Sequence, residues 1–176
     1  MSKLEASLTQ LRAWDNRLCM RFNHGARIAS VRRVFRFVSR LGDGVFWYAL
    51  ILAMLLTGWG HDLRPVAHMV LTGLVCTALY KWLKSKTSRP RPYAVEAAVS
   101  AAADPLDAFS FPSGHTLHAV AFTIIAVAYY PILAWLLVPF SLLVAMSRLI
   151  LGLHYPSDVL AGAALGALVA ASSLRL

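Results

Sequence analysis

Charged residues are scarce in this chain of 176 residues. Asp, Glu, Lys and Arg make up only 14% of the sequence, hydrophobic residues make up 59%, and the mean hydropathy is +0.62. A soluble domain is typically about 25% charged and about 45–50% apolar. The length suits one domain, and the apolar residues gather in runs long enough to cross a bilayer, which takes about 20 residues per helix. The sequence therefore predicts a polytopic membrane protein.

The sequence also has few cysteines, no cluster of carboxylates and no pattern typical of a secretory signal. Cys19 and Cys76 are the two cysteines, which are too few for a zinc site, and nothing supports a disulfide between them. No cluster of carboxylates indicates a magnesium site, so we expect neither a metal nor a cofactor. The first 24 residues are polar and charged, without the continuous apolar core of a cleavable signal peptide.

Basic residues are concentrated at the N-terminus. The formal net charge is +9, and nine of the 17 Lys and Arg lie in the first 43 residues. No recognition motif or stacking platform accompanies them, so we expect no nucleic-acid partner. Residues 3–22 carry leucines at helical spacing, and residues 26–40 carry five arginines among apolar side chains. This pattern predicts an amphipathic, Arg-rich interfacial region over residues 1–40, in contact with the lipid bilayer.

Five apolar stretches follow, over residues 41–59, 65–83, 113–130, 131–148 and 157–174. The predicted fold is all-α: a polytopic membrane helix bundle over residues 41–176, preceded by amphipathic interfacial helices. It has five transmembrane helices, or six if the first 40 residues contain another. The last stretch holds Gly162-x-x-x-Gly166, for which packing within the chain is favoured over a dimer interface. The oligomeric state is left open.

Polar residues fall where the predicted spans end. A polar segment over residues 84–112 separates the second and third spans, and a short segment over 149–156 separates the last two. Counting the spans in order places both segments on one face of the membrane. Ionisable residues at such positions are costly and are candidates for function. Those on this face are Lys84, Arg91, His115, Arg148, His154 and Asp158.

These residue types suit the transfer of a phosphoryl group. Lys and Arg side chains can hold a phosphate, and arginine does so with a planar fork of donors. The third span opens with Ser113-Gly114, and free backbone N–H groups at a helix N-terminus bind anions. Two histidines can divide the roles of nucleophile and acid, and Asp158, four residues after His154, can orient its imidazole.

Three motifs carry a resemblance to a known family. They are Lys84-x6-Arg91-Pro92, Pro112-Ser113-Gly114-His115 and Ser147-Arg148-x5-His154-x3-Asp158. In this order they resemble the motifs of the type 2 phosphatidic acid phosphatases, a superfamily that also includes bacterial acid phosphatases and vanadium haloperoxidases. The motifs extend over residues 84–158, and the resemblance does not cover the first 43 residues.

The resemblance implies a role for each motif residue. His154 would attack phosphorus and form a phosphohistidine, Asp158 would orient it, and His115 would protonate the leaving oxygen. The phosphoryl oxygens would be bound by Lys84, Arg91, Ser113, Gly114 and Arg148. The implied enzyme is a metal-independent phosphoric ester or diphosphate hydrolase that acts on lipids.

Three functions remain open at this point, and a lipid phosphatase is favoured. The predicted spans argue against a vanadate-dependent oxidase, since such enzymes of the resembled superfamily are soluble. A non-catalytic lipid-binding or transport protein would more often carry polar residues in the middle of broken spans. The candidate substrates are undecaprenyl diphosphate, phosphatidylglycerol phosphate, phosphatidic acid and a lipid A phosphate.

The expected location is the bacterial inner (cytoplasmic) membrane. With five spans the Arg-rich N-terminus shares a face with the candidate site, which the positive-inside rule would make cytoplasmic. Bacterial members of the resembled family usually work on the outer face, so the side stays open. We expect Lys81, Lys86 and Arg89, which flank the first motif, to extend to the interface, and Asp43 to lie in a turn or at a helix start.

Overall fold

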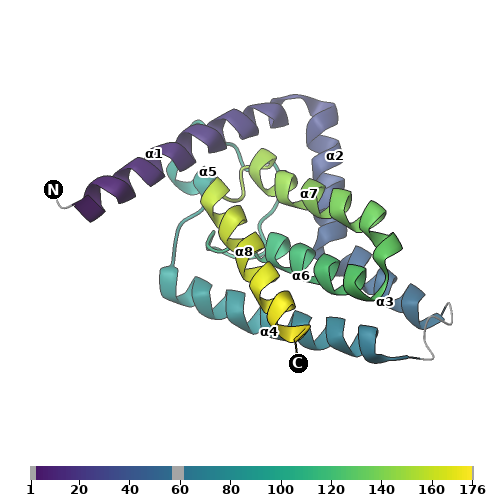
Figure 1. The fold of residues 1–176 in the computed structure, drawn as a ribbon. Coiled ribbons are helices and arrows are strands. Elements are labelled where there is room, and N and C mark those ends of the chain that lie inside the picture. The colour runs from purple at the N-terminus through teal and green to yellow at the C-terminus, as the bar shows by residue number, and fades with distance from the viewer. Residues whose placement is uncertain (1–2, 57–61, 176) are drawn as a thin grey trace.

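The computed structural model describes residues 3–56 and 62–175 of the chain. Its regular secondary-structure elements over these residues are helices (Figure 1). Within these residues the β-structure is limited to an isolated bridge between Pro90 and Phe109, so the predicted all-α fold is confirmed. The helices are α1 (Lys3–His24), α2 (Ala29–Arg40), α3 (Phe46–Leu56), α4 (Arg64–Thr87), α5 (Pro92–Val95), α6 (Gly114–Tyr129), α7 (Ala134–Ile150) and α8 (Pro156–Ser173).

Four helical segments are long and apolar enough to cross a membrane: Ala29–Leu56, Arg64–Thr87, Pro131–Ile150 and Pro156–Ser173. The first runs from α2 into α3 across a kink over Leu41–Val45, where Gly44 has a non-helical φ of 124°. The predicted start of the first span, at residue 41, lies at this kink. The predicted end of that span, over residues 57–59, lies outside the described residues. Helix α6 has 16 residues, or about 24 Å of length against a hydrocarbon core of about 30 Å. The membrane helix bundle is confirmed, and the number of spans stays a prediction.

Helix α6 forms the centre of the bundle and packs on α4, α7 and α8. Its contact with α8 is made at glycines. A Cβ at Gly162 would stand 2.6 Å from the Ser113 carbonyl oxygen, and a Cβ at Gly166 would overlap the carbonyl of Leu117. The Gly162-x-x-x-Gly166 pair therefore lets two backbones of the same chain approach closely, as predicted.

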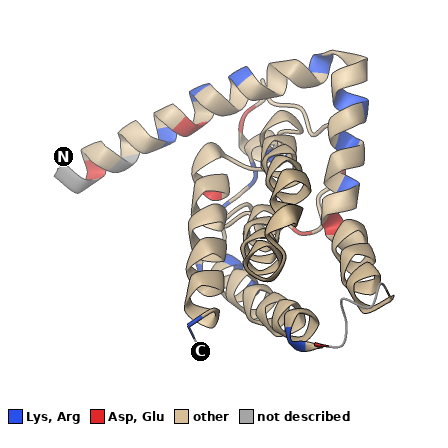
Figure 2. Cartoon of the chain, turned by 45° about the vertical axis from the view of Figure 1, so that its right-hand side comes forward, with Lys and Arg blue, Asp and Glu red and all other residues tan. Residues whose placement is uncertain are grey.

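The outer faces of the bundle are apolar. Large hydrophobic side chains of α4, α7 and α8 point away from the protein, among them Leu71, Leu74, Leu142, Leu160 and Leu168, each more than 60% exposed. Figure 2 shows Lys and Arg residues along α1 and α2, whereas α8 carries none between Pro156 and Ser173. Exposed apolar patches of this extent mark a surface that contacts lipid.

Helix α1 crosses the end of the bundle where α4 and α7 finish and where α6 and α8 begin (Figure 1). The Asn23 side chain fixes it there: its Nδ2 donates to the carbonyls of Ser100 and Ile150, both at 3.0 Å, and its Oδ1 accepts from the Ser100 N–H at 3.0 Å. Helix α1 and the polar segments thus lie at the same end of the molecule.

Candidate active site

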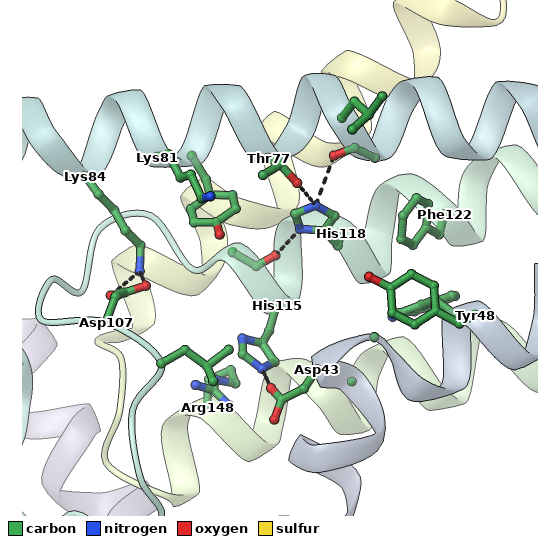
Figure 3. Close-up of a pocket in the computed structure, with 18 of the residues that line it drawn as sticks. Asp43, Tyr48, Thr77, Lys81, Lys84, Asp107, His115, His118, Phe122 and Arg148 are labelled. Carbon is green, nitrogen blue, oxygen red and sulfur yellow. Dashed lines mark hydrogen bonds and ion pairs between the residues drawn. The ribbon is translucent and has the colours of Figure 1, made fainter.

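A cavity of about 900 Å³ opens where the three motifs meet. Figure 3 shows the side chains that enter it from α4, from the loop before α6, from α6 and from α7. Six of the eight predicted site residues line it: Lys84, Arg91, Gly114, His115, Arg148 and His154. Ser113 and Asp158 are fully buried behind its wall.

His154 lies in the short loop between α7 and α8, with only 1% of its surface exposed. Its Nδ1 donates to the carbonyl of Ser110 at 2.6 Å, and Nη1 of Arg91 lies 3.4 Å from its Nε2. Burial, followed by the positive charges of Arg148, Arg91 and Lys84, holds the pKa of His154 well below its usual value of 6.5. A neutral imidazole with its proton on Nδ1 leaves a lone pair on Nε2, which is the form a nucleophile requires.

Asp158 supports the turn that carries His154. Its carboxylate accepts from the Tyr155 N–H at 2.9 Å and from Nη1 of Arg89 at 2.7 Å. The distance from its Oδ2 to Nδ1 of His154 is 3.7 Å, which is longer than a hydrogen bond. The Ser110 carbonyl is thus the direct partner of the imidazole, and the orienting role of Asp158 stays a prediction.

The three predicted cations converge on the same end of the cavity. Nζ of Lys84 lies 2.6 Å from one carboxylate oxygen of Asp107, and Nη2 of Arg91 lies 2.9 Å from the other. Nη1 of Arg148 donates to the Ser39 hydroxyl, whereas its buried Nε has no hydrogen-bond partner among the described residues. A buried N–H without a partner costs about 1–3 kcal/mol. Because Arg148 lines the cavity, we expect its guanidinium to turn this donor toward an oxygen of a bound phosphate.

Asp107 is a site residue that the motifs did not identify. Burial opposes its ionisation, but the hydrogen bond and charge of Lys84, with the charge of Arg91, outweigh burial and lower its pKa below the usual 3.8. Charge balance in the sequence could have identified Asp107. Three cations gathered at a buried site need a counter-ion, and few carboxylates lie near the first two motifs.

The second motif is divided between the cavity and the protein interior. Gly114, the first residue of α6, faces the cavity. The hydroxyl of Ser113 instead bonds to that of Thr116 at 3.0 Å, and its N–H donates to the Asp158 carbonyl at 3.0 Å. The predicted contact of Ser113 with phosphate stays a prediction, and in this structure the residue joins α6 to α8.

Two histidines of α6 face the cavity in different environments. Nε2 of His115 pairs with the carboxylate of Asp43. His118, one turn along, has both nitrogens engaged, Nδ1 with the carbonyl of Gly114 at 2.8 Å and Nε2 with the Thr77 hydroxyl at 3.1 Å. His118 therefore has a structural role here, whereas His115 keeps one ring nitrogen available.

Arg89 does not extend to the membrane interface, and that prediction was wrong. Its Nη2 pairs with Asp15 of α1 at 2.7 Å, and its Nη1 pairs with Asp158 at 2.7 Å. Its guanidinium lies 4.1 Å from the ring centroid of Tyr155. Two buried carboxylates attract the guanidinium more strongly than the bilayer surface does. Sequence alone gave no sign that Asp15 would reach this site, because it lies more than 70 residues away.

Away from the cations, the cavity has an apolar wall. It continues between α3 and α4, where it is lined by Ile51, Leu52, Leu55, Val70 and Leu74. One end of the cavity thus fits a phosphate and the other fits a hydrocarbon chain.

Across residues 3–56 and 62–175, no three His, Cys, Asp or Glu side chains gather as a metal site would require.

Comparison with known proteins agrees with these motifs. Residues 45–176 match the model of the PAP2 superfamily. The chain is 35% identical over 114 residues to undecaprenyl-diphosphatase BcrC of Bacillus subtilis (strain 168), an alignment that covers 64% of this chain and 58% of the relative. It is 32% identical over 130 residues to the bacitracin transport permease protein BcrC of Bacillus licheniformis, covering 74% and 60%. The chain thus spans about three fifths of the length of these curated relatives.

Two solved structures have a similar fold. The transmembrane PAP2 type phosphatidylglycerolphosphate phosphatase from Bacillus subtilis superposes with a TM-score of 0.77 and 25% identity, over 94% of this chain and 85% of that one. Aquifex aeolicus LpxE superposes with a TM-score of 0.78 and 25% identity, over 93% and 96%. Since the family model matches three quarters of the sequence, including all three motifs, this multi-pass membrane protein belongs to the PAP2 superfamily.

Proposed function

We propose that this protein is an enzyme that hydrolyses the phosphate or diphosphate of a membrane lipid through a phosphohistidine on His154. Membership of the PAP2 superfamily supports a phosphatase. The observation that carries the proposal is the two-sided cavity, in which Lys84, Arg91, Arg148 and two histidines stand at one end of an apolar groove. A lipid phosphate has the same division between an anionic head and an apolar chain.

In the first chemical step, the lone pair on Nε2 of His154 attacks phosphorus. The bond from phosphorus to the leaving oxygen breaks, and that oxygen takes the electron pair and a proton from His115. The leaving oxygen is the alcohol oxygen of a lipid monophosphate or the bridging oxygen of a lipid diphosphate. The cations neutralise the charge on the non-bridging oxygens, which is the largest contribution to catalysis in reactions of this type. Arg148 is well placed for this because its buried Nε lacks a partner among the described residues.

In the second step, water attacks the phosphorus of the phosphohistidine. His115, now neutral, accepts a proton from the water. The bond from phosphorus to Nε2 breaks, the electron pair returns to His154, and inorganic phosphate leaves. Both histidines end the cycle in the protonation states in which they began.

The relatives narrow the choice of substrate. One curated relative is named an undecaprenyl-diphosphatase, and one structural neighbour is named a phosphatidylglycerolphosphate phosphatase. We favour undecaprenyl diphosphate because the relative that carries this activity in its name shares 35% identity. The apolar lining from α3 and α4 suits a long hydrocarbon chain. Phosphatidylglycerol phosphate, phosphatidic acid and a lipid A phosphate are the remaining candidates.

A second candidate function rests on the other curated relative, which is named a transport permease protein. A non-catalytic lipid-binding or transport protein would use the same cations to hold a headgroup. It would not need a His154 whose pKa is lowered by burial and by three nearby positive charges, so that the imidazole stays neutral. This feature favours the hydrolase.

Phosphate release from a panel of the four lipids, by detergent-solubilised protein with EDTA present, tests the proposal. We expect release from at least one lipid, fastest from undecaprenyl diphosphate, and its loss in His154→Ala. No release from any lipid, or equal release by the variant, would contradict the catalytic assignment and favour binding or transport.

The bacterial inner membrane is the location that we propose. A second assay addresses the side on which the site works. In intact cells, a headgroup substrate that does not cross the membrane should be hydrolysed if the site faces outward and spared if it faces the cytoplasm.

A further inference from the structure

The turn between α2 and α3 is built from the sequence Gly42-Asp43-Gly44. It forms a kink over Leu41–Val45, at which the chain passes from α2 to α3. Gly44 has a φ of 124°, which residues other than glycine rarely adopt. A Cβ at Gly42 would lie 3.1 Å from a methyl group of Val144 in α7 and 3.7 Å from Cδ2 of His115. The two glycines therefore place the intervening carboxylate directly beside α6.

The carboxylate of Asp43 pairs with Nε2 of His115 across 72 residues of sequence. Figure 3 shows this pair with Arg148 next to it, and with Asp43 on the opposite side of the imidazole from Lys84 and Asp107. All these residues line the same cavity. The imidazole of His115 thus has one nitrogen held by a carboxylate, while its Nδ1 has no partner among the described residues.

We propose that Asp43 is a positioning residue for the leaving-group side of the reaction, holding His115 so that Nδ1 delivers its proton to the departing lipid oxygen. This inference rests on the hydrolase function proposed above. Asp43 lies outside the three motifs and before the part of the chain that matches the family model.

The proton balance explains why a carboxylate suits this position. A carboxylate only accepts hydrogen bonds, so it fixes the proton on Nε2. A second proton, on Nδ1, makes the ring cationic, and Asp43 offsets that charge beside the positive Arg148. When the bond from phosphorus to the lipid oxygen breaks, the Nδ1 proton moves to that oxygen and the ring becomes neutral. In the next step Nδ1 takes a proton from the attacking water.

The leaving group provides the test. An alkoxide needs a proton as it departs, whereas a phenolate is stable without one, since phenols ionise near pH 10 and water near about pH 16. Loss of a positioned acid should therefore slow an alkyl phosphate much more than an aryl phosphate with the same alkyl chain. The quantity to compare is kcat/KM, which covers the steps up to departure of the alcohol and is independent of phosphohistidine hydrolysis.

We expect Asp43→Asn to lower kcat/KM for the alkyl phosphate by about a hundredfold, the contribution typical of general acid catalysis, and for the aryl phosphate by less than about tenfold. His115→Ala should show the same selectivity, and Asp43→Asn should add little further loss in the His115→Ala background, because residues that act as a unit are not additive. Asp62→Asn is the matched control, since Asp62 is half exposed and pairs with Arg64 at the far end of α4.

Equal losses on the two substrates would overturn the proposal and indicate that Asp43 is a structural counter-ion of Arg148. An unchanged rate on the alkyl phosphate, or additive losses in the double variant, would overturn it as well. Failure of the proposed function looks different, because the wild-type protein would then release no phosphate from either substrate. If Asp43→Asn does not fold, the selectivity of Asp43→Glu, which keeps the charge but displaces it, gives the same comparison.

Discussion

Substitution of Asp15 by alanine is the perturbation for which the structure gives the clearest magnitude. The Asp15 side chain is 1% exposed. It pairs with Nη2 of Arg89 at 2.7 Å, accepts from the Ser157 N–H at 2.9 Å, and also accepts from the Ser157 hydroxyl at 2.5 Å. Removing one partner of a buried ion pair typically costs about 3–5 kcal/mol, because the other charge is left uncompensated. Arg89 keeps Asp158 as a partner, so we place the loss at about 3 kcal/mol, the lower end of that range.

Thermal unfolding of the detergent-solubilised protein measures this loss. For a domain of this size, 1 kcal/mol shifts the midpoint by about 2–4 °C, so Asp15→Ala should lower it by roughly 6–12 °C. The control is Asp62→Ala, which breaks an ion pair whose side chains are 85% and 52% exposed. An exposed pair contributes about 0–1 kcal/mol. Equal shifts in the two variants would refute the reasoning that α1 is fastened to the start of α8 by a buried carboxylate.

Three other predictions follow from the packing and charges of the site. Gly166→Ala should destabilise the protein by about 1–3 kcal/mol, because the added Cβ would overlap the carbonyl of Leu117. The control is Gly25→Ala, which should change the thermal unfolding midpoint little, because the nearest neighbour of its Cβ would be 3.9 Å away. Because the pKa of His154 is lowered, its protonation should reduce kcat/KM only well below pH 6.5; an acid limb at or above 6.5, after correction for substrate ionisation, would contradict this. The carboxylate of Asp107 competes with phosphate for Lys84 and Arg91. Asp107→Asn removes this competitor, so product phosphate should bind as an inhibitor up to about tenfold more tightly, equivalent to about 1.4 kcal/mol. Weaker inhibition by phosphate would count against that competition.

Much of the architecture could be predicted from the sequence because its cause is local. Apolar runs of about 20 residues have few stable structures other than a membrane helix. The glycine pair in α8 could be interpreted as a close helix contact because small residues permit such an approach. The start of the first span near residue 41 was harder to place, since only the short kink over Leu41–Val45 separates α2 from α3.

The candidate site residues could be predicted to lie together because their types and order match the three motifs of the resembled family. Lys84, Arg91, His115, Arg148 and His154 do line one cavity.

The supporting carboxylates could not be predicted in the same way. Asp15, Asp43 and Asp107 reach the site by tertiary packing, and no fixed spacing relates them to the residues that they contact. Asp43 was predicted to lie in a turn or at a helix start, and it lies in the kink between α2 and α3. Such a pattern carries no information about the histidine that the carboxylate contacts. Asp107 lies in a polar segment with several other charged residues, and no motif distinguishes it from them.

The central claim is that His154 carries the phosphoryl group, and trapping that intermediate is the most direct test. The protein would be mixed with a lipid substrate labelled with ³²P at the hydrolysed phosphate, quenched in alkaline detergent before one turnover is complete, and separated from free lipid. The account predicts a label on the protein that survives alkali, is released by mild acid, and is absent from His154→Ala. Label retained by His154→Ala, or phosphate release by that variant at the wild-type rate, would contradict it.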